Sequence, residues 1–171
     1  MATIRTFVSL MLLWGPAFAG AWQTSATAKL TLQQSTTEPL AFSNASLGLQ
    51  GTIRPLRGDR LQIIAIALGD APIEAEVRDF TLMSTGGATY EPIAVGGGPD
   101  LIFPLDRLPL GQAVGQILPS NAIVEVKRVS RTSVTLDADP GATLAFVYEL
   151  PEGSVMRALR LPDGSELALR R

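Results

Sequence analysis

The sequence of 171 residues contains no cysteine and no histidine. It therefore cannot form nucleophile–base pairs that use Cys or His, zinc sites with thiolate or imidazole ligands, haem ligation by His or Cys, or a thiol redox centre. The chemistry that is left is that of carboxylates, of serine with lysine, of oxygen-ligand metals such as Ca²⁺, and of binding without catalysis. No cofactor is expected.

Lysine and tryptophan are scarce, and this weakens the remaining enzyme classes. A Ser–Lys pair would have to use Lys29 or Lys127, and Ser130 would lie on the opposite face of a strand from Lys127. A glycosidase needs two carboxylates in an aromatic cleft, but Trp22 is the single tryptophan that would remain after removal of the N-terminal segment described below. The 14 basic and 16 acidic residues form no basic block, which argues against nucleic acid as a partner. We expect no enzymatic activity.

The N-terminus has the pattern of an export signal over residues 1–19. Arg5 provides the positive charge, Phe7–Trp14 is a short apolar run, and Ala17-Phe-Ala19 fits the small-x-small cleavage rule. Ala19-Gly-Ala21 offers a second cleavage frame. The apolar run is short of the roughly 20 residues that span a bilayer, although an uncleaved anchor is the alternative.

The rest of the chain is predicted to be a polar leader, residues 20–28, followed by a single domain over 29–171. No later segment is long enough to cross a membrane as a helix. The mature protein is therefore expected to be soluble and either periplasmic or secreted, in the manner of a bacterial envelope protein. Without cysteine it has to be held together by its core alone.

Short alternating segments predict an all-β, antiparallel β-sandwich. The stretch Thr132–Pro151 is expected to be a hairpin with an acidic turn, because Leu144, Phe146, Tyr148 and Leu150 alternate along its second half. Leu61–Leu68 is an apolar run that predicts a strand buried on both faces. A first short strand over Lys29–Gln33 would place Leu30 and Leu32 inward.

Glycine-containing turns and one irregular segment complete the expected fold. Ser84–Ala88 and Leu161–Gly164 have Gly-Gly and Asp-Gly hairpin signals. Residues 94–120 lack strand periodicity and read as an apolar loop insertion, with at most one short helix at Pro109–Leu118. About nine or ten short strands with turns every 8–12 residues are typical of a sandwich.

The order of these motifs resembles the telokin-like, immunoglobulin-type extracellular domains of bacterial secreted proteins and lipoprotein antigens. The residues that carry the resemblance are Asp79-Phe-Thr-Leu82, Tyr90, the Pro140-Gly141 turn and the Phe146-to-Pro151 strand. It covers about residues 60–169 and implies an immunoglobulin-like fold and a binding or scaffold role. The chain departs from the family at Leu68-Gly-Asp70, in residues 94–120, and in having no lipid-bearing cysteine.

Two groups of residues are candidate sites. Asp137 and Asp139 could bind Ca²⁺ with their carboxylates, although aspartate before Pro-Gly also suits a turn. Residues 99–110 hold more apolar side chains than a solvated loop needs, so they either cover one end of the sandwich or bind a partner. The candidate partner-binding residues are Leu101, Ile102, Phe103, Leu105 and Leu108.

The sequence therefore predicts a non-catalytic exported binding or scaffold module. Its partner would be a protein or another envelope component that contacts loop 94–120. The alternative is a periplasmic protein that binds a small ligand or calcium through the Asp137/Asp139 turn.

Overall fold

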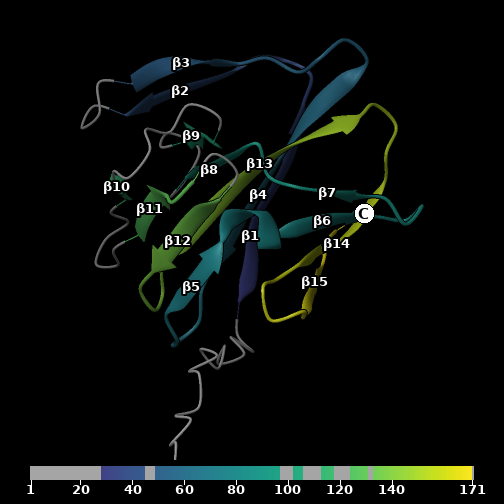
Figure 1. Ribbon diagram of the computed structural model, residues 1–171. Coiled ribbons are helices and arrows are strands. Elements are labelled where there is room, and N and C mark those ends of the chain that lie inside the picture. Colours follow the sequence, from purple (N-terminus) through teal and green to yellow (C-terminus); the bar gives the residue numbers. More distant parts are fainter. Residues whose placement is uncertain are drawn as a thin grey trace, which may run out of the picture.

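Strand β4 (Asp59–Ala67) lies inside a five-stranded antiparallel sheet (Figure 1). The structure is a computed structural model, and it describes residues 28–44, 49–96, 102–105, 113–117, 124–130 and 133–170. Leu61 to Ile66 are all buried, as the apolar run predicted, because neighbours cover both faces of the strand. β4 pairs on one side with β1 (Lys29–Thr36) and on the other with β13 (Thr143–Pro151).

The described strands form four antiparallel sheets. The central sheet has the order β1-β4-β13-β8-β9, with β8 at Ala94–Gly96 and β9 at Ile102–Pro104. A second sheet, β10-β11-β12-β5, contains Ala113–Ile117, Val124–Arg128, Val134–Ala138 and Ile73–Glu76. A third, β15-β14-β6-β7, contains Glu166–Ala168, Met156–Arg160, Thr81–Ser84 and Thr89–Tyr90. The hairpin of β2 (Leu40–Asn44) and β3 (Leu49–Ile53) is the fourth.

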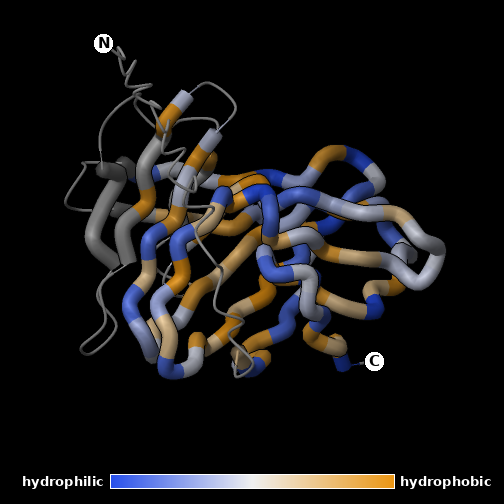
Figure 2. The backbone as a smooth tube through the Cα atoms, turned by 60° about the horizontal axis from the view of Figure 1, so that its bottom comes forward, coloured by the Kyte–Doolittle hydropathy of each residue, from blue (hydrophilic) through white to orange (hydrophobic). Residues whose placement is uncertain are grey.

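Both faces of the central sheet carry a hydrophobic cluster. On one face, residues such as Ile64 and Phe146 pack against side chains of the two four-stranded sheets and form the larger core. On the other face, Leu61, Ile63 and Val147 pack under Phe42 of the β2–β3 hairpin. Figure 2 shows hydrophobic segments along the strands in the middle of the molecule. The predicted all-β antiparallel class is confirmed, and the arrangement is that of a β-sandwich.

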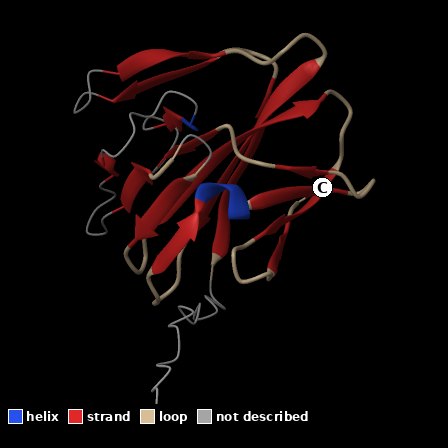
Figure 3. Ribbon diagram, viewed as in Figure 1, coloured by secondary structure: helices blue, strands red, loops and turns tan. Residues whose placement is uncertain are grey.

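The second layer of the sandwich is continuous through a short connection. The 3₁₀ turn η2 (Val77–Asp79) joins β5 of one four-stranded sheet to β6 of the other (Figure 3). Phe80, which follows it, stacks on Phe146 of the central sheet with ring centroids 4.4 Å apart. The buried hydroxyl of Tyr148 donates a hydrogen bond to the carbonyl oxygen of Phe80 (2.9 Å). These contacts fasten the connection to the central sheet.

The stretch Thr132–Pro151 contains the two expected strands, but it is not a hairpin. β12 lies in a four-stranded sheet and β13 in the central sheet, so the turn between them passes from one layer to the other. The turn is held by hydrogen bonds between the backbones of Gly69 and Gly141 (2.9 Å) and of Leu68 and Ala142 (2.8 Å). Gly141 has φ of +77°, a conformation that glycine adopts without strain.

β1 differs from its prediction in its length and in the side of the sheet on which its leucines lie. It extends to Thr36, and its register shifts between Leu30 and Leu32. Such a β-bulge adds one residue to the alternation. Leu30 therefore packs against the larger core and Leu32 against the smaller one, so the expectation that both face the same side is wrong.

Residues 94–120 do not form a loop in their described parts. Ala94–Gly96 and Ile102–Pro104 pair with each other and extend the central sheet from β13. Ala113–Ile117 is strand β10, paired with β11, so the expected helix at Pro109–Leu118 is wrong where the structure describes it. Val114 and Ile117 are β-branched residues, which favour strands, and Gly115 weakens a helix.

The remaining predicted features are confirmed or lie outside the described residues. Ser84–Ala88 and Leu161–Ser165 close the expected turns, with φ of +86° at Gly87 and +84° at Gly164. The export signal, 1–19, and most of the polar leader, 20–28, lie outside the described residues. Among the residues that are described, no helix is long and apolar enough to cross a membrane.

Candidate binding cleft

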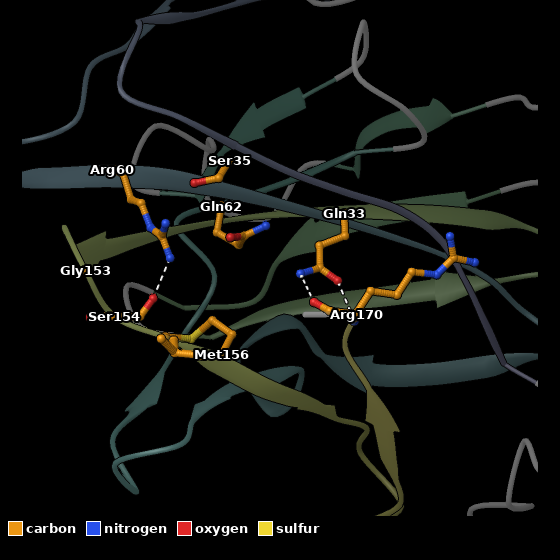
Figure 4. Close-up of a pocket in the computed structure, with 9 residues that line it drawn as sticks. Gln33, Ser35, Arg60, Gln62, Gly153, Ser154, Met156 and Arg170 are labelled. Carbon is orange, nitrogen blue, oxygen red and sulfur yellow. Dashed lines mark hydrogen bonds between the residues drawn. The ribbon is translucent and has the colours of Figure 1, made fainter.

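A cleft of about 320 Å³ opens where the β1 side of the central sheet meets the turn between β13 and β14. Figure 4 shows its polar residues, which come from four separate parts of the chain. Its lining residues are Gln33, Ser35, Arg60, Gln62, Gly153, Ser154, Val155, Met156 and Arg170. The size is at the lower end of the range of about 300–1,000 Å³ that is usual for small-molecule sites.

The strand register explains why polar side chains reach this interior position. Residues paired across an antiparallel ladder point to the same face of a sheet. Gln62 pairs with Ser35 on one side and Tyr148 on the other, and Tyr148 belongs to the larger core. The core-facing row of β4 thus changes from isoleucine to Gln62 and Arg60 where the cleft opens.

Gln62 forms a fixed polar point in the cleft. Only 3% of its surface is exposed. Its Nε2 donates a hydrogen bond to the carbonyl oxygen of Gln34 (2.8 Å), which holds the amide in one orientation. Burying an amide costs free energy unless its polar atoms find partners, so an apolar residue would be the ordinary choice here.

Arg60 supplies the positive charge of the cleft. Its Nη2 donates a hydrogen bond to the carbonyl oxygen of Ser154 (2.5 Å), which fixes the guanidinium against the β13–β14 turn. Its Nε is buried and has no hydrogen-bond acceptor among the described residues. The described residues also provide no carboxylate that pairs with Arg60, in contrast to Arg157 and Arg160, which both contact Glu166.

Gln33 and Arg170 form the far wall of the cleft. Gln33 Nε2 donates to the carbonyl oxygen of Arg170, and the backbone N–H of Arg170 donates to Gln33 Oε1, both at 2.9 Å. The side-chain amide thus acts as a short strand partner for the main chain. Figure 4 shows that the Arg170 side chain runs away from Arg60, so this residue contributes its main chain to the wall and leaves Arg60 as the cation of the cleft.

The remaining wall is apolar. Met156 is buried beside the cleft, whereas Val155 is 54% exposed and lies among the residues that line it. Val155 is held in place because its carbonyl accepts a hydrogen bond from the N–H of Thr85 (2.8 Å). The cleft therefore combines the Arg60 guanidinium, amides and hydroxyls with an aliphatic surface, and none of the described residues that line it has a carboxylate.

Two groups outside the cleft have shifted pKa values. Burial raises the pKa of the Tyr148 hydroxyl well above its usual value. The pKa of Asp79 is also raised, first by partial burial and then by the nearby Glu76 carboxylate, and Arg78 opposes this effect. Burial is thus the main cause of both pKa shifts, and both groups lie outside the cleft.

The predicted partner-binding residues are only partly described. Leu101 and Leu108 lie outside the described residues, and the structure gives only the backbone of Ile102 and Phe103, in β9. Leu105 is partly buried and packs against the larger core. That contact fits a role in covering the sandwich, and partner binding by this segment stays a prediction.

Asp137 and Asp139 are not brought together in a turn. Asp137 is exposed within β12, where it pairs in register with Glu74 of β5, and Asp139 follows the end of the strand. The backbone carbonyl of Asp139 accepts a hydrogen bond from the N–H of Ala142 (3.2 Å), so Asp139 belongs to the turn that follows β12. The part of the chain that the structure describes holds no group of three or more acidic residues able to bind a metal ion.

The cleft was not predicted from the sequence, although one signal was present. Gln62 is the only polar residue within the run Leu61–Leu68. A glutamine in a strand that is buried on both faces breaks the local pattern, and such breaks are expected at functional sites. Comparisons with known protein families, with curated proteins and with solved structures found no match to this chain, and none places it in a family.

Proposed function

We propose that this protein is a non-catalytic, exported binding module that holds a small polar ligand in the cleft at Gln62. One observation carries the proposal: the core-facing row of β4 becomes polar at Gln62 and Arg60 beside an open cleft of about 320 Å³. Polar residues there oppose core formation, and a ligand that uses them explains their presence. This is the small-ligand function expected as the alternative, at a different place from the Asp137/Asp139 turn.

The chemistry of the lining supports binding over catalysis. The cleft offers hydrogen-bond donors and acceptors from glutamine, serine and arginine, together with the aliphatic groups of Val155 and Met156. A hydrolytic site would need a nucleophile next to a base, or two carboxylates. Fixed amides and an aliphatic wall suit the recognition of a ligand that leaves unchanged.

A melting-temperature screen of the mature protein tests the function. The panel contains small carboxylates, phosphate esters, sugars and amines. A ligand at about 100 times its Kd stabilises the folded state by about 2.7 kcal/mol, which raises the Tm of a domain of this size by about 5–10 °C. We expect at least one class to do so.

Two glutamine variants connect the shift to the cleft. Gln62→Leu keeps the volume of the side chain and removes its amide, so it should abolish the ligand-induced shift. Gln50→Leu is the matched control, because Gln50 is exposed on the β2–β3 hairpin. Retention of the shift in Gln62→Leu, or no shift with any class, would contradict the proposal.

Export is tested separately. The first 19 residues support it, and their removal should leave Gly20 as the N-terminal residue of the mature protein. Mass spectrometry of the protein recovered from the periplasm or medium of a bacterial host measures this directly. A protein recovered only from the cytoplasm at full length would contradict export.

A further inference from the structure

The cleft contains one positive charge that the described part of the chain does not balance. Arg78, Arg157 and Arg160 each lie within 4.0 Å of a glutamate carboxylate, at 2.8 to 3.6 Å. Arg60 has no such partner among the described residues, and its one hydrogen bond goes to the backbone of Ser154. A partly buried guanidinium without a counter-ion favours an anionic ligand.

The number and shape of the charged groups restrict the class of anion that fits the cleft. Because the Arg170 side chain runs away from Arg60, Arg60 is the one guanidinium of the described lining residues that lies beside Ser35 and Gln62 (Figure 4). One guanidinium balances one negative charge, and its planar fork matches the two oxygens of a carboxylate. A phosphate dianion at Arg60 would keep a second charge, and Figure 4 shows no second guanidinium beside Arg60 among the labelled residues.

The apolar wall indicates what the carboxylate is attached to. Val155 and Met156 follow Ser154 directly along the chain, and all three line the cleft. An exposed aliphatic side chain that borders a polar site gains free energy when a ligand covers it. The ligand should therefore have an aliphatic part next to its acidic group.

The geometry points to a small aliphatic monocarboxylate as the ligand class, with its carboxylate at Arg60 and its hydrocarbon part along Val155 and Met156. This inference rests on the proposed function, since it assigns a ligand to the same cleft. Gln62 and Ser35 line the cleft beside Arg60 and offer further polar groups to the acid.

Calorimetric titration of the mature protein with acetate, butyrate and hexanoate tests the inference. Each additional methylene that is buried contributes about 0.8 kcal/mol, so the affinity should rise by up to about fourfold per methylene. Butyramide, which has the same shape as butyrate without its charge, should bind at least about tenfold more weakly. Inorganic phosphate should bind more weakly than butyrate.

Three variants locate the interaction. Arg60→Gln should lower the affinity for butyrate at least about tenfold, whereas Arg57→Gln should leave it unchanged because Arg57 is exposed and does not line the cleft. Since Arg60 also holds the β13–β14 turn, Val155→Asp provides an independent test at an exposed position. Its carboxylate should repel the ligand without disturbing the fold, which the melting curve checks.

The outcomes separate this inference from the proposed function. If butyramide binds as tightly as butyrate, or phosphate binds more tightly, the assignment of a monocarboxylate ligand is overturned. If Gln62→Leu also abolishes that binding, the proposed binding function of the cleft is kept. An affinity that does not change from acetate to hexanoate, or an Arg60→Gln variant that binds like the wild type, also overturns the monocarboxylate assignment. No binding of any of these acids at about 10 mM, which would saturate a site with a Kd of 1 mM or below, overturns it as well.

Discussion

The hydroxyl of Tyr148 provides a way to measure how much one hydrogen bond between the two layers contributes to stability. The Tyr148→Phe variant keeps the aromatic ring in the core and removes only the hydrogen bond to the Phe80 carbonyl. Tyr148 is 0% exposed, so water cannot replace the lost donor without opening the core. Loss of a buried hydrogen bond that leaves one partner behind costs about 1–3 kcal/mol.

Urea denaturation followed by circular dichroism measures this loss. We expect the free energy of unfolding to fall by about 1–3 kcal/mol with an unchanged slope m. The Tm should fall by roughly 2–12 °C, at about 2–4 °C per kcal/mol for a domain of this size. The Tyr90→Phe variant is the matched control, because Tyr90 is only partly buried, on the edge strand β7. Loss of its hydroxyl should change the free energy of unfolding by less than about 0.5 kcal/mol.

A Tyr148→Phe variant as stable as the wild type would refute this reasoning. It would mean that the Phe80 carbonyl finds another donor at no cost, and that the layers are held by apolar contacts alone. An altered slope m would instead show that the connection unfolds separately from the rest of the core.

Three further predictions concern the ionisation of Tyr148, the β2–β3 hairpin and calcium binding. Because the pKa of Tyr148 is raised in the folded state, its contribution to stability is complete below the unfolded value of about 10 and is lost as the pH rises further. In a variant without the other tyrosine, ultraviolet absorbance should show ionisation only as the protein unfolds; ionisation of a folded protein near pH 10 would contradict this. Gly51→Ala should destabilise the β2–β3 hairpin by about 1–3 kcal/mol in urea unfolding, because the new Cβ would lie 2.8 Å from the ring of Phe42, and unchanged stability would show that the ring moves freely. Calorimetry with Ca²⁺ should give no heat, and a melting shift that Asp137→Asn abolishes would restore the calcium alternative.

The fold class could be predicted from the sequence because burial leaves a direct pattern in it. The run Leu61–Leu68 identified a strand covered on both faces, and the alternation from Leu144 to Leu150 identified the core-facing row of β13. Turns that depend on particular residues, such as Gly87 and Gly164, were also found. The immunoglobulin-like resemblance stays a prediction.

The sequence could not show how strands combine over long distances. The bulge at β1 has no local signal, since Leu30 and Leu32 look like ordinary alternation until the pairing with β4 is known. Likewise, nothing within Thr132–Pro151 shows that β12 and β13 enter different sheets.

The cleft escaped prediction for the same reason. Gln33, Gln62, Ser154 and Arg170 are far apart in the sequence, and only the sheet pairing brings them together. Arg60 at the start of a strand is also ordinary by itself. Its lack of a carboxylate partner in the described part of the chain becomes visible only in the structure.

The pairing of β4 with β13 has a consequence for the time course of folding. Ile66 finds its partner Leu144 only after most of the chain has been made, and until then one side of β4 has no neighbour. Domains dominated by such distant pairings fold in milliseconds to seconds, more slowly than those built from local contacts. A newly made chain therefore leaves one edge of β4 without its strand partner until β13 has been synthesised.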